Sequence, residues 1–239
     1  MRRLALLWAS CAALGIAAAP IAPFSAMSPG ALQPPWRETQ IARVRPAELA
    51  MVNDAGVNVL RMRSESAAGG ATLSLDEDAR AAPVLSWRWK VDRVVDKADM
   101  TLKAGDDYAA RVYVFFDVPM EDLSFAQWIR IRIARALYGS EVPAAAICYV
   151  WDNRHPVGTT MPNAYTERVR MIVLESGAAL PATWVEEARD VAADYRSAFG
   201  LAPGAAVPRV SGIAASADTD QTGESVTAWF GDFMLAPRP

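Results

Sequence analysis

The sequence predicts a mainly β protein, a β-sandwich of jelly-roll or galactose-binding-like type with two inserted or packed α-helices. Short runs rich in Val, Ile and aromatic residues alternate with clusters of Gly, Asp, Asn and Pro, which is the pattern of strands joined by turns. Of the 239 residues, 52% are apolar and 21% are charged, a composition that can bury a core. No internal repeat or long linker divides the chain, so one domain is expected.

Eight runs are predicted to be strands and two segments are predicted to be helices. Capping boxes at Ser124 to Gln127 and at Thr183 to Glu186 mark the two helix starts. Gly139 and Gly200 mark the two helix ends. In chain order, the expected strands are residues 57–62, 71–75, 84–91, 108–118, 145–151, 168–174, 210–217 and 226–235.

The N-terminus has the pattern of a secretory signal peptide. Arg2 and Arg3 precede an almost unbroken apolar run over residues 4–19, and small residues follow. The run is short for a membrane span, so cleavage is favoured over an anchor. We therefore expect residues 1–26 to be a signal peptide and residues 27–239 to be a single domain. The mature protein should then be periplasmic or secreted, with no stable membrane span.

Composition excludes several classes of function. The formal net charge of −3 argues against a general nucleic-acid binder, which would carry a basic excess. Two cysteines and one histidine are too few for a disulfide framework, a zinc finger or an iron–sulfur cluster. Cys148 lies in an apolar run and is predicted to be a buried, inert thiol.

Several sequence blocks, in order, resemble a known family. The resemblance covers about residues 35 to 235 and is to an uncharacterised exported bacterial family, domain of unknown function 3047. It implies an exported single domain and supplies no activity and no catalytic residues. The blocks are Trp87-Arg-Trp-Lys-Val91, Ala104-Gly-Asp-Asp107 with Ala110-Arg-Val-Tyr-Val114, Tyr149-Val-Trp-Asp-Asn153, Asn163-Ala-Tyr-Thr166, Asp194-Tyr195 with Phe199-Gly200, and Asp218 to Glu224 with Ala228-Trp-Phe-Gly-Asp232.

Strand alternation predicts a cationic face. Five cations alternate away from apolar residues, and they would gather on one sheet surface if their strands are neighbours. Bidentate arginines beside Tyr113 could hold a uronic acid, a phosphorylated glycan or another carboxylate. The alternative is internal pairing with the acids of the second predicted helix, Glu186, Glu187, Asp190 and Asp194. The five cations are Arg88, Lys90, Arg111, Arg168 and Arg170.

The tryptophans on the predicted strands divide into two groups. Trp87 and Trp89 share a face with apolar neighbours, so core positions are expected. Trp151 ends its strand beside Asp152, where a loop begins, and both are assigned to the predicted ligand site.

The segment from Asp218 to Gly223 resembles the first half of a calcium loop. Its oxygen-bearing side chains alternate and a glycine follows, but Trp229 stands where a helical loop has its bidentate Glu. The alternative is a polar turn whose side chains cap their own backbone. The candidate ligands for a Ca²⁺ cofactor are Asp218, Asp220, Thr222, Glu224 and Asp232.

These features predict a non-catalytic periplasmic domain that binds a glycan or another polar anionic ligand. The glycan is suggested by the analogy between this fold and that of carbohydrate-binding modules. One alternative is a carbohydrate-active hydrolase or lyase that uses Asp and Glu, and another is a structural factor of the cell envelope. Two carboxylates converging in a cleft would favour the enzyme. His155 is the single imidazole and no Gly-x-Ser-x-Gly motif accompanies it, so nucleophilic catalysis is not indicated.

Overall fold

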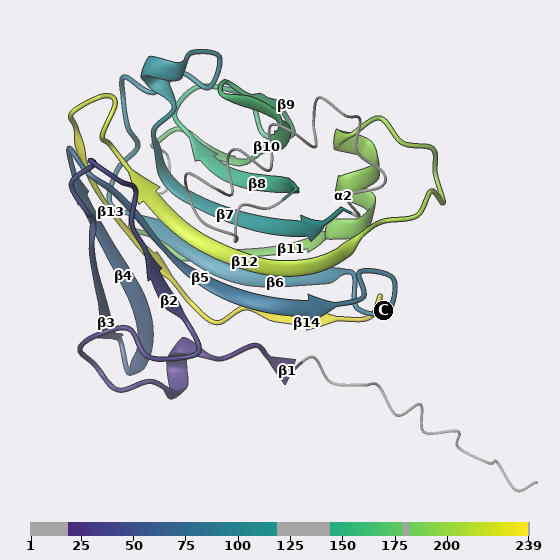
Figure 1. Ribbon diagram of the computed structural model, residues 1–239. Coiled ribbons are helices and arrows are strands. Elements are labelled where there is room, and N and C mark those ends of the chain that lie inside the picture. Colours follow the sequence, from purple (N-terminus) through teal and green to yellow (C-terminus); the bar gives the residue numbers. More distant parts are fainter. Residues whose placement is uncertain (1–18, 119–143, 179–181, 239) are drawn as a thin grey trace, which may run out of the picture.

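Two sheets of seven strands each pack face to face in the computed structural model, which describes residues 19–118, 144–178 and 182–238 (Figure 1). Sheet A has the order β1 (Ala19–Pro20), β14 (Met234–Ala236), β6 (Val84–Val91), β13 (Ser225–Phe230), β4 (Val57–Glu65) and β3 (Glu48–Asp54), with β11 (Val185–Asp190) also paired to β6. Sheet B has the order β2 (Arg37–Thr39), β5 (Ala68–Glu77), β12 (Arg209–Asp218), β7 (Tyr108–Asp117), β8 (Ala145–Asp152), β10 (Thr166–Ser176) and β9 (Thr160–Asn163). The prediction of a mainly β sandwich is therefore confirmed.

The core lies between the two sheets and is rich in aromatic rings. On β6, Trp87 and Trp89 face inward and are 2% and 0% exposed. The ring of Trp87 lies 5.4 Å from that of Tyr149, and the ring of Trp89 lies 5.8 Å from that of Trp151, both of which come from β8. Cys148 is a free buried thiol, and burial raises its pKa, as expected for an inert group.

The second predicted helix is partly wrong. Residues 185–190 form β11, and only Val191–Ala198 form a helix, α2, at one end of the sandwich (Figure 1). Six residues of β11 pair with β6, so tertiary hydrogen bonding overrides the local helix signals. The side chain of Asp190 caps α2 by accepting from the Ala193 N–H at 2.8 Å.

Other expectations about local structure need smaller corrections. The predicted strand over residues 226–235 is broken between β13 and β14, and strands β1, β2, β3 and β9 were not predicted. The predicted helix over residues 124–139 lies outside the described residues. Two short 3₁₀ helices complete the described elements, η1 (Phe24–Ala26) and η2 (Lys103–Gly105). None of the helices in the described ranges has the length and apolar character needed to span a bilayer.

Residues 19–27 pack as part of the domain. β1 pairs with β14, and the Ile21 N–H donates to the Phe233 carbonyl at 2.8 Å. Phe24 is 0% exposed, with its ring 4.6 Å from that of Trp36. Cleavage at the predicted boundary, residue 26, would remove these contacts, and the boundary stays a prediction.

Candidate functional site

The five predicted cations do not share one surface. Arg88 and Lys90 project from the outer face of sheet A, because their neighbours on β6 face the core. Arg111 belongs to sheet B, where it pairs with Val150 on β8. Arg170, on β10, pairs with the core residue Ile147 of β8. Its side chain therefore points to the side of sheet B opposite to that of Arg111. The expectation of one cationic face is wrong, because these strands lie in two sheets and the register divides their side chains.

The two cations of β10 lie near the helical end of the sandwich. The Arg170 guanidinium is 5.2 Å from the centre of the Phe199 ring. The Arg168 side chain donates from Nε to the Ala144 carbonyl, and burial lowers its pKa. Both contacts are internal to the domain.

Arg111 is an internal partner of nearby acids. Its guanidinium forms an ion pair with Asp218 and another with Asp106, at 3.6 Å, and also donates to the Tyr113 hydroxyl at 3.0 Å. Arg111 is only 3% exposed. The internal-pairing alternative therefore describes Arg111, although its partners come from sheet B and its loops. Burial raises the pKa of the Asp218 carboxyl, and Arg111 opposes that rise.

Part of the predicted calcium loop converges. Carboxylate oxygens of Asp107, Asp218 and Asp220 lie within 4.8 Å of one another. Asp107, which was not predicted, accepts from the Thr222 N–H at 2.6 Å, so it ties the loop to the start of β7. These are the residues that could hold a cation, but three carboxylates are few for Ca²⁺ and Arg111 already supplies positive charge. The geometry favours the polar turn, and calcium binding stays a prediction.

Two of the other predicted calcium ligands, Glu224 and Asp232, lie elsewhere. Glu224 accepts from the backbone N–H groups of Asp96 and Lys97 at 3.0 and 2.8 Å. Asp232 accepts from the Ser25 N–H and hydroxyl at 2.9 and 2.5 Å. Neither residue belongs to the group of three converging carboxylates.

Trp151 and Asp152 are buried and hold a loop. The Trp151 indole N–H donates to the Gly177 carbonyl at 3.1 Å. Asp152 is 1% exposed, and its carboxylate accepts from the backbone N–H groups of Arg154 and His155 at 2.7 and 2.6 Å. In this arrangement they position the loop rather than a ligand.

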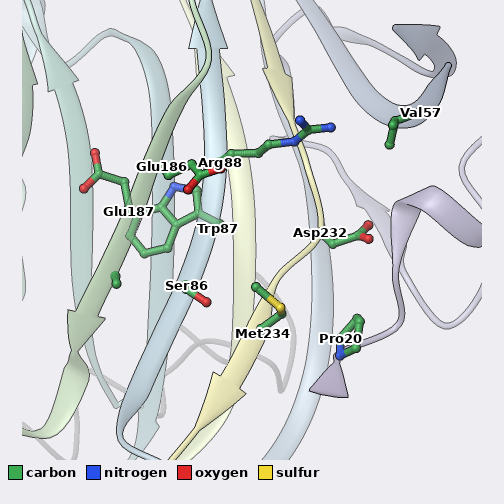
Figure 2. Close-up of a pocket in the computed structure, with 10 residues that line it drawn as sticks. Pro20, Val57, Ser86, Trp87, Arg88, Glu186, Glu187, Asp232 and Met234 are labelled. Atoms are coloured by element: carbon green, nitrogen blue, oxygen red, sulfur yellow. The ribbon is translucent and has the colours of Figure 1, made fainter. Parts of the chain in front are cut away.

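A groove of about 590 Å³ lies on the outer face of sheet A (Figure 2). We call it groove 1. Its walls come from β6, β11, the break between β13 and β14, the N-terminal segment and the start of β4. The lining residues are Pro20, Val57, Ser86, Trp87, Arg88, Glu186, Glu187, Ala188, Asp232 and Met234.

Arg88 is the cation of groove 1. A Cβ atom on Gly231 would lie 2.6 Å from Arg88 Cγ and 2.7 Å from Nε, so this glycine gives the side chain room to lie across the chain. The guanidinium carbon is 4.4 Å from the centre of the Trp184 ring. Within the described ranges, Arg88 forms no ion pair with a carboxylate. An aromatic ring and a glycine therefore position its charge, which also acts on the Asp54 carboxyl at longer range and helps to lower its pKa.

Lys90 lies beside groove 1 between two tryptophans. Its Nζ is 4.9 Å from the ring centres of both Trp184 and Trp229. Asp54 Oδ2 accepts from Lys90 Nζ at 2.9 Å and from the Trp184 indole N–H at 2.8 Å. The hydrogen bond from Lys90 lowers the pKa of the Asp54 carboxyl. This network fixes Trp184, which in turn supports Arg88.

The acids of groove 1 do not converge. Glu186 is the cross-strand neighbour of Arg88, whereas Asp232 lies across the groove and is held by Ser25 (Figure 2). Glu187 points away from Arg88, and its carboxylate accepts from the Trp89 indole N–H at 3.2 Å. Burial raises the pKa of Glu187 to about 7.

Sequence reasoning missed Trp184 and Gly231. Trp184 stood in an expected helix start, but Trp184, Glu186 and Ala188 also alternate at strand spacing, which could have indicated their shared face. No pattern in the sequence identifies Gly231 as the residue beneath Arg88.

The chain belongs to the family described as proteins of unknown function DUF3047, whose model matches residues 34–234. This confirms the resemblance noted in the sequence. No curated protein is significantly similar to the chain.

Several solved structures are similar to the chain at low sequence identity. One is the family 11 carbohydrate-binding module of the cellulosomal cellulase Lic26A-Cel5E of Clostridium thermocellum, with 8% identity, a TM-score of 0.45, and coverage of 94% of this chain and 96% of that one. Another is the xyloglucanase domain of NopAA from Sinorhizobium fredii in complex with cellobiose, with 7% identity, a TM-score of 0.44, and coverage of 85% and 93%. A third is the endoglucanase cel12A of Rhodothermus marinus, with 9% identity, a TM-score of 0.41, and coverage of 84% and 95%.

Proposed function

We propose that this is an exported, non-catalytic binding protein that holds an anionic glycan or a small acidic sugar in groove 1. The observation that carries the proposal is Arg88, a guanidinium placed over Trp184 that forms no direct ion pair with a carboxylate of the described residues. A guanidinium offers a planar fork of donors that matches a carboxylate. A carboxylate of the ligand would form the direct ion pair that Arg88 lacks.

The positions and hydrogen bonds of the carboxylates in groove 1 favour binding over hydrolysis. A glycosidase needs two carboxylates that flank one bond. In groove 1, both oxygens of Asp232 accept hydrogen bonds from Ser25, and Glu187 turns toward Trp89. Glu186 alone remains exposed beside Arg88, where it can accept from sugar hydroxyl groups.

Export is part of the proposal because the N-terminus has the composition of a signal peptide. The packing of Phe24 and the pairing of β1 support a cleavage site before Ala19. N-terminal sequencing of the exported protein tests this: a first residue near position 19 supports the proposal, and Met27 contradicts the boundary.

Calorimetric titration with D-galacturonate and neutral D-galactose tests the binding. We expect galacturonate to bind and galactose to bind more weakly or not at all. Arg88→Gln should raise the dissociation constant for galacturonate by about 10- to 100-fold, as expected for loss of a charged hydrogen bond. Arg80→Gln is the matched control, since Arg80 is exposed and pairs with Asp78 outside the groove. Equal affinity of wild type and Arg88→Gln would contradict the proposal.

A further inference from the structure

A second groove, groove 2, lies on the same outer face of sheet A. Its volume is about 320 Å³, and Asp92, just beyond β6, belongs to its lining. Asp92 and Arg88 are four residues apart on alternating positions, with Lys90 between them, so β6 leads from one groove to the other. Three arginines dominate groove 2, and its lining includes Glu48, Arg61, Arg63, Arg93, Thr227 and Trp229.

Arg61 is the unpaired cation of groove 2. Arg63 pairs with Glu65 at 3.4 Å, and Arg93 pairs with Asp92 at 3.3 Å. The Arg61 side chain has no hydrogen bond or ion pair to any described residue, and its Nε is buried without an acceptor. Arg61 also lines the groove, where no carboxylate pairs with its charge, so an anion in groove 2 would be stabilised.

The two unpaired arginines are linked by one row of side chains. Trp229 on β13 pairs with Lys90 on β6 at one edge and with Arg61 on β4 at the other. Arg88 stands two residues from Lys90 along β6. With ordinary strand spacing and rise, the Cα atoms of Arg88 and Arg61 are about 12 Å apart. Grooves 1 and 2 share no lining residue, so a ligand that contacts Arg88 in one and Arg61 in the other has to extend past Lys90.

We propose that the ligand is an acidic polysaccharide chain that crosses the outer face of sheet A, with one carboxylate on Arg88 and a second on Arg61. This inference rests on the proposed function of groove 1 and adds a second subsite and a polymeric ligand. The grooves also contain Glu48 and Glu186, which can accept from sugar hydroxyl groups but repel a continuous line of phosphates. With a net charge of −3, this favours spaced carboxylates over nucleic acid.

The test compares chain lengths. The full mature protein is titrated with oligogalacturonates and oligomannuronates of one to six residues, because both series carry one carboxylate per sugar. We expect the hexamer of whichever series binds more tightly to have at least tenfold higher affinity than its monomer. Once one carboxylate is bound, the second is held close to its own subsite. Arg61→Gln should remove this gain and leave monomer affinity unchanged, whereas Arg88→Gln should weaken both. Arg80→Gln should change neither.

Two results would overturn the inference in different ways. If the monomer binds through Arg88 but affinity does not rise with length, or if Arg61→Gln leaves the gain intact, the second subsite is wrong and the proposed function stands. If no acidic sugar of any length binds, both are wrong. Arg61→Lys is a second variant that separates loss of binding from loss of folding. It keeps the positive charge but lacks the planar set of guanidinium donors. It should lose most of the gain while it keeps the wild-type melting temperature.

Discussion

Replacing Phe24 by alanine should lower the free energy of unfolding by about 3 to 5 kcal/mol, the usual cost of emptying a buried phenylalanine site. Phe24 is 0% exposed, and its ring lies 4.6 Å from Trp36 and 6.2 Å from Phe233. The surrounding rings belong to separate parts of the chain, so they cannot collapse fully into the space. The expected loss is a large share of the stability of an ordinary domain.

Urea denaturation followed by tryptophan fluorescence measures this effect. Ile41→Ala is the control, since Ile41 is 51% exposed and its truncation should change stability by less than about 0.5 kcal/mol. Deleting residues 1–18 should leave the midpoint unchanged, whereas deleting residues 1–26 should lower it at least as far as Phe24→Ala. A Phe24→Ala protein within about 0.5 kcal/mol of wild type would refute the inclusion of this segment in the domain.

Three further predictions concern the site and its surroundings. Gly231→Ala should push the Arg88 side chain aside and weaken galacturonate binding several-fold in calorimetry, because the new Cβ would lie 2.6 Å from Arg88 Cγ. Burial raises the pKa of Glu187 from 4.5 to about 7, so its contribution to stability is present below pH 4.5 and is lost as the pH rises through 7. With solvent screening, Glu187→Gln should remove about 1 kcal/mol of this pH dependence in urea titrations between pH 4.5 and 8, and an unchanged profile would contradict it. Arg111→Ala should cost about 3 to 5 kcal/mol, since Asp218 would be left buried and unpaired. A melting temperature equal to that of wild type would show that the pair is not needed.

Local alternation predicted which residues of β6 face the core and which face outward. Trp87 and Trp89 are buried while Arg88 projects outward, because every second side chain of a strand shares a face. The same rule could not show that Arg111 and Arg170 lie on opposite sides of sheet B. That outcome depends on register with β8, which is set by contacts distant in the sequence.

The segment from Thr183 to Gly200 shows the limit of local signals. A capping box and helical spacing predicted one helix. Instead, the first half of the segment forms a strand that pairs with the edge of β6. This change brings Trp184 to Arg88 and builds a wall of groove 1. Of the candidate site, the sequence therefore predicted only Arg88 and Lys90, the two cations of β6.

The most direct test of the central claim follows the indole N–H signals of the tryptophans by NMR during titration with hexagalacturonate. The signals of Trp184 and Trp229 should shift in a saturable way, because both rings contact the cations between the two grooves. The signals of Trp89 and Trp151, which are buried between the sheets, should stay unchanged. Shifts confined to the core tryptophans, or no saturable shift of Trp184, would contradict binding at the outer face of sheet A.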